Sequence, residues 1–95
     1  MNEEDMSKAA NRDYLRQLDH VKVLQLLDLM DLSKYRNSFI QEHIDGEVLV
    51  DLGEDELKDL GVQSKIHLLR LSKLINGSTP ARRYLEEGNP YGSIG

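Results

Sequence analysis

Hydrophobic residues recur at intervals of three and four positions after Asp19. The residues with this spacing are Val23, Leu26, Leu27 and Met30. Because such a repeat places them along one side of a helix, the pattern predicts an amphipathic helix whose stripe lies in a core. The Asp19 carboxylate can cap the start of this helix.

Two shorter helices are predicted next. Ser33 can cap the first, in which Tyr35 and Phe39 stand four residues apart and therefore on one inward face. The sequence Ile-Asp-Gly at 44–46 is a turn signal, and the Asp45 carboxylate can accept from the backbone N–H groups that open the second helix, which carries Val48, Leu49 and Leu52.

Two more helices complete the pattern. The segment 54–61, EDELKDLG, has acidic residues in its first turn, where the helix dipole favours them, and ends at a glycine. We expect its Leu57 and Leu60 to point inward. Ser64 can cap the longest of the five helices, which runs to Asn76 and Gly77. Its inward residues are Leu68, Leu71 and Ile75.

The two ends of the chain lack this periodicity. Residues 1–14 are polar and acidic, and we expect a flexible arm or an extension of the first helix there. Residues 78–95 carry several glycines and prolines, which predicts a flexible tail or linker. One domain is therefore expected over 15–77. Modification of the tail residues Tyr84 and Tyr91 stays open.

Length and composition fit a single all-α domain. The chain has 95 residues, of which 39% are hydrophobic, 31% charged and 5% aromatic, and it has no cysteine. One modest core is expected at this size. The absence of cysteine suits a reducing compartment, so we expect a cytoplasmic protein, with the nucleus as an alternative. No apolar run reaches the roughly 20 residues that cross a bilayer, and no secretory signal is visible.

The ordered set of helix, turn and core positions over roughly residues 18–76 resembles a sterile alpha motif (SAM) domain. The matching residues are Val23, Leu26, Leu27, Leu32, Tyr35, Phe39, Ile44, Asp45, Gly46, Leu49, Leu52, Leu57, Leu60, Gly61, Val62, His67, Leu71 and Ile75. The resemblance implies a compact bundle of five helices, four short and the last longer. It also implies a protein-interaction module, since many such domains associate head to tail and a few bind RNA.

Three positions depart from the family pattern. Leu18 stands where the family often has tryptophan, and Asp31 stands where glycine is common. Ile66 occupies a position where glycine often precedes the histidine. The last change adds an aliphatic side chain at the start of the final helix, where it can alter a binding face.

Charge is divided between two neighbouring segments. Residues 39–62 hold eight acidic residues and one lysine, whereas residues 63–83 hold five basic residues and no acidic one. In the resembled family the middle helices form one interaction face, and the start of the last helix forms the other. The acidic interaction face then corresponds to Asp45, Glu47, Asp51, Glu54 and Asp55, and the basic interaction face to Lys65, Ile66, Arg70 and Lys73. Complementary surfaces of this kind orient and accelerate encounters.

Catalytic, metal and cofactor sites are not expected. Five short helices leave little room for a pocket that shifts a catalytic pKa, and the sequence has no glycine-rich phosphate loop. The carboxylates around Asp45 lack the spacing of a calcium loop, and the three histidines are not four apart on one helix. We expect His67 to be a structural residue that bonds to the backbone.

These observations predict a protein-protein interaction module, a scaffold or signalling element without enzymatic activity. Its expected partners are other SAM domains, in self- or hetero-association between the acidic and basic faces. The alternative is a monomeric SAM domain that binds a different protein. RNA or lipid binding by the basic face is a further alternative, which the net charge of -5 disfavours. No small-molecule substrate is expected.

Overall fold

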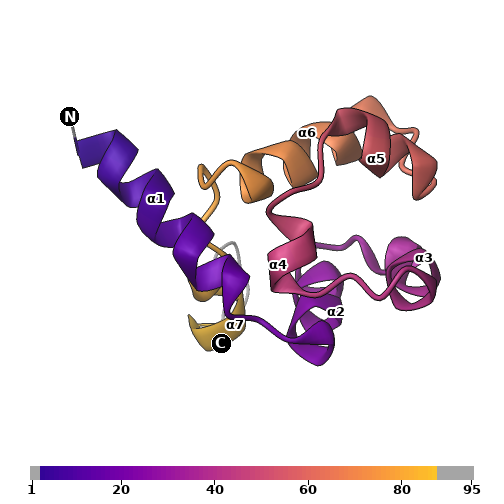
Figure 1. The fold of residues 1–95 in the computed structure, drawn as a ribbon, viewed down its shortest axis with the longest axis horizontal. Coiled ribbons are helices and arrows are strands. Elements are labelled where there is room, and N and C mark those ends of the chain that lie inside the picture. The colour runs from indigo at the N-terminus through magenta and orange to yellow at the C-terminus, as the bar shows by residue number, and fades with distance from the viewer. Residues whose placement is uncertain (1–2, 88–95) are drawn as a thin grey trace.

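The computed structural model describes residues 3–87 and shows helices joined by short loops (Figure 1). In chain order the elements are α1 (Glu3–Arg16), α2 (His20–Leu29), the 3-10 turn η1 (Ser33–Tyr35), α3 (Arg36–Gln41), α4 (Gly46–Leu49), α5 (Glu54–Asp59), α6 (Lys65–Ile75) and α7 (Ala81–Glu87). No strand occurs in these residues, so the all-α class is confirmed.

The predicted count of five helices is too low. The five predicted segments correspond to α2, to η1 with α3, and to α4, α5 and α6. The structure adds α1 before them and α7 after them, side by side with each other (Figure 1). No helix among residues 3–87 combines the length and the apolar character needed to cross a membrane.

The predicted stripes form one core. The residues placed there from the sequence are buried: Val23, Leu26, Leu27, Met30, Tyr35, Phe39, Leu57, Leu60, Leu68, Leu71 and Ile75. Leu15 from α1 and Tyr84 from α7 join the same cluster. The core therefore extends beyond the five predicted segments into both added helices.

Side-chain caps fix three of the predicted helix starts. The Asp19 carboxylate accepts from Lys22 N at 2.9 Å, and the Asp45 carboxylate accepts from Val48 N at 3.0 Å. Ser64 Oγ accepts from His67 N at 3.3 Å. Ser33 does not act as expected: it begins η1, and neither η1 nor α3 has a side-chain cap.

Helix α1 occupies the segment where a flexible arm or an extension of the next helix was expected, and it is separate from α2. Its Leu15 is completely buried, and Arg12 donates from Nη2 to the carbonyl of Val50 at 3.2 Å. A Cβ at Gly46 would collide with the Leu15 carbonyl, so glycine lets α4 and the end of α1 lie against each other. The buried Leu15, the hydrogen bond of Arg12 and this close approach help to hold α1 in place, and none of them produces a periodic pattern in the sequence.

Helix α7 lies where a flexible tail was predicted. It packs against α1 and α2, with Ala81 and Tyr84 buried. Gly77, at φ +92°, ends α6 in the left-handed region, and Pro80 stands just before α7. Glycine and proline here mark a tight connection between two packed helices rather than a linker. The rest of the predicted tail, residues 88–95 with Tyr91, lies outside the described residues.

Candidate interaction surface

The predicted acidic face lies on α4, α5 and the loop between them. Glu47, Asp51, Glu54 and Asp55 are exposed, while Asp45 is half-buried because it caps α4. Glu54 also pairs with Lys58 of its own helix at 3.5 Å. Asp45 and Glu54 are thus partly engaged within the chain, which leaves Glu47, Asp51 and Asp55 as the more available carboxylates.

A groove of about 370 Å³ lies beside this face, between the end of α3, α4 and α5. Four aliphatic residues line it: Ile44, Val48, Leu52 and Leu60. Three carboxylates also line it: Glu42, Glu56 and Asp59. Val48 is 40% exposed, so an apolar surface is open to solvent within an acidic rim. We call this feature the acidic groove.

None of the three carboxylates of the acidic groove was placed on the acidic face from the sequence. For two of them the sequence spacing could have indicated a shared position, because Glu56 and Asp59 stand three residues apart and therefore lie on one side of α5. Glu42 follows α3 and reaches the groove only through the turn into α4, which the sequence does not reveal. Glu56 has a second role, since its Oε1 accepts from Gly53 N at 2.7 Å at the start of α5.

The basic face lies on α6. Lys65 and Lys73 are exposed, and neither forms an ion pair within the part of the chain that the structure describes. Ile66 is 63% exposed and Leu69 is 54% exposed. The side of α6 that faces away from the core therefore presents two aliphatic side chains among cations.

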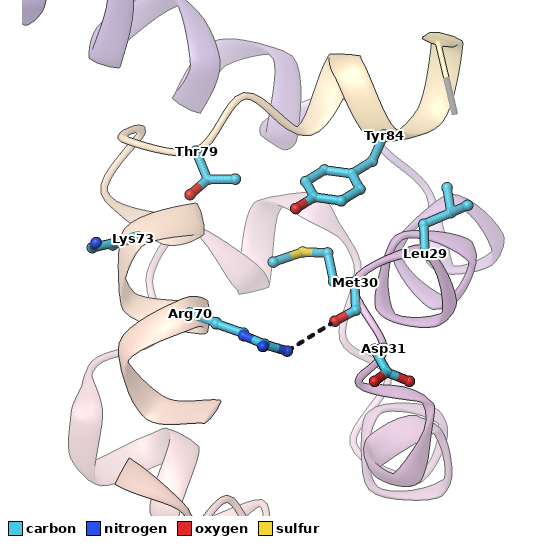
Figure 2. A pocket seen from close by; sticks show the side chains of 7 residues that line it. All are labelled: Leu29, Met30, Asp31, Arg70, Lys73, Thr79 and Tyr84. Carbon is cyan, nitrogen blue, oxygen red and sulfur yellow. Dashed lines mark hydrogen bonds between the residues drawn. The ribbon is translucent and has the colours of Figure 1, made fainter. Parts of the chain in front are cut away.

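Arg70 does not belong wholly to this exposed surface. Its Nη1 lies 3.5 Å from the carbonyl oxygen of Met30, at the end of α2, and the side chain reaches across from α6 (Figure 2). A cation at this place offsets the negative end of the helix dipole of α2. Arg70 thus contributes to the fold as well as to the charge of α6.

His67 holds the start of α6 against η1, although its partner differs from the expected one. Its Nδ1 lies 2.6 Å from the hydroxyl of the buried Tyr35, with the two rings edge to face. The sequence predicted a bond to the backbone. Burial raises the pKa of the Tyr35 phenol, which keeps its hydroxyl protonated and able to donate.

His20 and His43 also meet, with ring centroids 6.2 Å apart. This contact joins the start of α2 to the turn after α3 and was not visible in the sequence. Among the residues that the structure describes, no group of three or more histidine or acidic side chains is arranged to hold a metal ion.

Comparison with known proteins decides the family. The model of the SAM domain (sterile alpha motif) matches residues 17–78, which is well over half of the chain. The chain belongs to the sterile alpha motif family. The resemblance seen in the sequence is confirmed, and SAM domains are in general non-catalytic protein-interaction modules.

Curated relatives share the same region. The chain is 41% identical over 54 residues to diacylglycerol kinase eta of Drosophila ananassae, and equally similar to that of Drosophila melanogaster. The match spans 57% of this chain and 3% of those enzymes, so it carries no information on kinase activity here. No solved structure matches the chain.

The SAM match separates family features from additions. Both the acidic groove and the exposed side of α6 lie within residues 17–78, whereas most of α1 and all of α7 lie outside. Ile66, where the family often has glycine, projects into solvent from the first turn of α6. The exposed Ile66 side chain therefore adds apolar surface at the start of α6.

Proposed function

We propose that this SAM domain associates head to tail, with the exposed side of α6 of one molecule seated on the acidic groove of the next. The observation that carries the proposal is the matching chemistry of the two surfaces. The acidic groove has an aliphatic floor and three carboxylates, and α6 offers Ile66 and Leu69 between Lys65 and Lys73.

Apolar contact and charge have separate roles in this arrangement. Removal of Ile66 from water supplies affinity, because buried apolar side chains near the centre of an interface dominate binding energy. The lysines and carboxylates at the rim direct the encounter and exclude other orientations. Each molecule has one surface of each kind, so the contact is heterologous and extends into an open chain unless it closes into a ring.

Molar mass in solution, measured against protein and salt concentration, tests the proposal. The molar mass of the wild type is expected to increase with protein concentration at low salt. It should decrease as added salt screens the charges at the rim of the contact. Asp59→Lys in the groove, or Lys65→Glu on α6, should each give a monomer. A mixture of the two variants should give a dimer, since one intact surface of each kind remains.

Matched variants away from the surfaces provide the control. Glu87→Lys and Lys22→Glu make the same charge changes on α7 and α2 and should leave the assembly unchanged. Ile66→Ala should weaken assembly even at low salt. Asp51 lies on the acidic face predicted from the sequence but does not line the acidic groove. Asp51→Lys should therefore reduce the molar mass of the assembly less than Asp59→Lys does.

A wild type that stays monomeric at high concentration and low salt would contradict self-association. The same two surfaces would then serve a different protein partner. If the chain assembles but neither Asp59→Lys nor Lys65→Glu matters, the contact uses other surfaces and this placement is wrong.

A further inference from the structure

A second concave site lies between the end of α2, α6 and α7 (Figure 2). Its volume is about 420 Å³, within the range of roughly 300–1,000 Å³ usual for ligand pockets. Thr79 and Tyr84 form part of its lining, and both lie beyond residue 78, where the SAM match ends. The pocket is therefore built jointly by the SAM domain and its C-terminal addition.

The wall contributed by the addition is held in place. The carbonyl of Lys73 accepts from Ser78 N at 2.9 Å and from Thr79 N at 3.1 Å, which fixes the loop that leaves α6. Ala81, the first residue of α7, is buried. At the far end of α7, Glu86 accepts a hydrogen bond from the Tyr14 hydroxyl at 3.1 Å. The pocket is thus a preformed feature with two anchored sides.

The lining combines positive charge with an apolar floor. Arg70 reaches into the pocket, and Lys73 stands one turn later at its outer edge with its ammonium turned away from α2 (Figure 2). Asp31 is the one carboxylate among the described residues that line the pocket. Met30 and the ring of Tyr84, both buried, provide an apolar surface beside the guanidinium.

Arg70 is available for an additional contact. Its bond to the Met30 carbonyl is long, at 3.5 Å, and uses one of the five N–H donors of the guanidinium. The planar group suits bidentate pairing with a carboxylate, and Arg70 is exposed enough to be reached from solvent. A carboxylate that enters the pocket from solvent can pair with the remaining donors.

We propose that this pocket binds an acidic peptide segment of a partner protein, in which a carboxylate side chain pairs with Arg70 and a neighbouring aliphatic side chain packs on Met30 and Tyr84. Charge complementarity selects this occupant, because two cations, Arg70 and Lys73, line the pocket against one carboxylate, Asp31. The inference goes beyond the proposed head-to-tail contact, since it uses α7 and needs no second copy of the chain.

Nuclear magnetic resonance titration of the full chain tests this inference, at a concentration where the molar mass is that of a monomer. The probe is a blocked tetrapeptide of alternating leucine and glutamate, and its control has glutamine in place of glutamate. Saturable shifts are expected at the side-chain N–H of Arg70 and at the amides of Thr79 and Tyr84. The glutamine peptide should bind at least about tenfold more weakly.

Substitutions test which residues bind the peptide. Arg70→Gln should weaken peptide binding roughly tenfold or more, whereas the matched control Arg83→Gln, which removes the same charge from the exposed side of α7, should not. Because Arg70 also contacts α2, Thr79→Val is a second variant. It replaces the hydroxyl of a lining residue with a methyl group and so removes a donor from which the entering carboxylate can accept, with an expected loss of about two- to tenfold. Thermal unfolding checks that each variant is folded.

Four outcomes of the peptide titration would overturn the inference: no saturable shifts, equal binding of the glutamine peptide, shifts that map to the acidic groove, or full binding by both Arg70→Gln and Thr79→Val. Inorganic phosphate is titrated as a further probe. If phosphate produces the same shifts with the same affinity, the pocket responds to any small anion and the peptide assignment is wrong. These results do not depend on whether the chain self-associates, so the two proposals fail separately.

Discussion

The segment that matches the SAM family and the two helices that flank it are held by different kinds of interaction. Within residues 17–78, apolar stripes meet in a core, and Asp19, Asp45 and Ser64 cap helix starts. In α1 the one fully buried side chain in the described part is Leu15. The SAM segment is thus stabilised largely by its own hydrophobic pattern, while the flanking helices depend on where they dock.

The docking of α1 relies on backbone contacts. Asn11 donates from Nδ2 to the carbonyl of Gly77 at 2.7 Å. Gly46 and Gly77 allow the backbone of α1 to approach closely at two places, opposite Leu15 and Lys8. A helix held in this way adds few apolar contacts but is sensitive to any side chain at either glycine. The two parts of the molecule should therefore respond differently to substitution.

The largest effect is expected in the core of the SAM segment. Phe39→Ala removes a fully buried ring and should lower the free energy of unfolding by about 3–5 kcal/mol. Its neighbour Ile40 is 49% exposed, so Ile40→Ala should change stability by less than about 1 kcal/mol. Denaturant titration followed by circular dichroism measures both. Similar losses from the two substitutions would contradict the orientation of α3.

The next largest effect shows whether α1 belongs to the same cooperative unit. Leu15→Ala empties a completely buried site and should cost about 2–5 kcal/mol if α1 unfolds together with the SAM segment. Met6→Ala, at a largely exposed position of the same helix, is the control. If Leu15→Ala speeds hydrogen exchange in α1 alone and leaves global unfolding unchanged, α1 is a separately docked helix.

The same contrast explains what the sequence could predict. The stripe from Val23 to Met30 and the caps at Asp19 and Ser64 are local patterns, so the corresponding helices were found with nearly correct ends. Leu15 and Tyr84 are isolated apolar residues in polar segments. Only a contact with distant parts of the chain buries them, and a local pattern cannot reveal that contact.

The candidate surface was predictable to a similar extent. Exposure of Lys65, Ile66 and Lys73 followed from helical spacing on α6. The acidic groove did not, because Glu42, Val48 and Asp59 come from three separate segments. Arg70 was assigned by spacing to the exposed side of α6, but its contact with α2 depends on how two helices pack. Residues that share one helix were predictable, and sites between elements were not.

A pair of glycine substitutions isolates the docking contact of α1. Gly61 and Gly77 both have a positive φ, of 99° and 92°, so alanine at either position carries a strain of roughly 1–2 kcal/mol. A Cβ at Gly61 meets open space, whereas a Cβ at Gly77 collides with the backbone of Lys8. Gly77→Ala should therefore cost about 1–3 kcal/mol more than Gly61→Ala in the free energy of unfolding. Equal losses in the free energy of unfolding would show that α1 can move away from residue 77 without a measurable cost in stability.

The smallest effect concerns the contact between α1 and α7, which we expect to weaken in acid. The hydrogen bond from Arg82, and next the one from Tyr14, hold the pKa of Glu86 below its ordinary value of 4.5. A carboxyl whose pKa is lowered by folding stabilises the folded state above its ordinary pKa, and this contribution disappears as the pH falls through the lower, folded value. Burial, and next the bond to Glu86, raise the pKa of Tyr14 above 10.0, so its own contribution is present below pH 10 and is lost only as the pH rises past the folded value. Hydrogen-exchange protection factors of α7 amides should therefore be a little lower at pH 3 than at pH 7, with a smaller change in α6. Because Glu86 is exposed and water screens its interactions, the change should be small.

The variant Glu86→Gln should remove this difference between pH 3 and pH 7, while Glu87→Gln, one residue further along the same helix, should retain it. An unchanged acid response in Glu86→Gln would assign the effect to another carboxyl group.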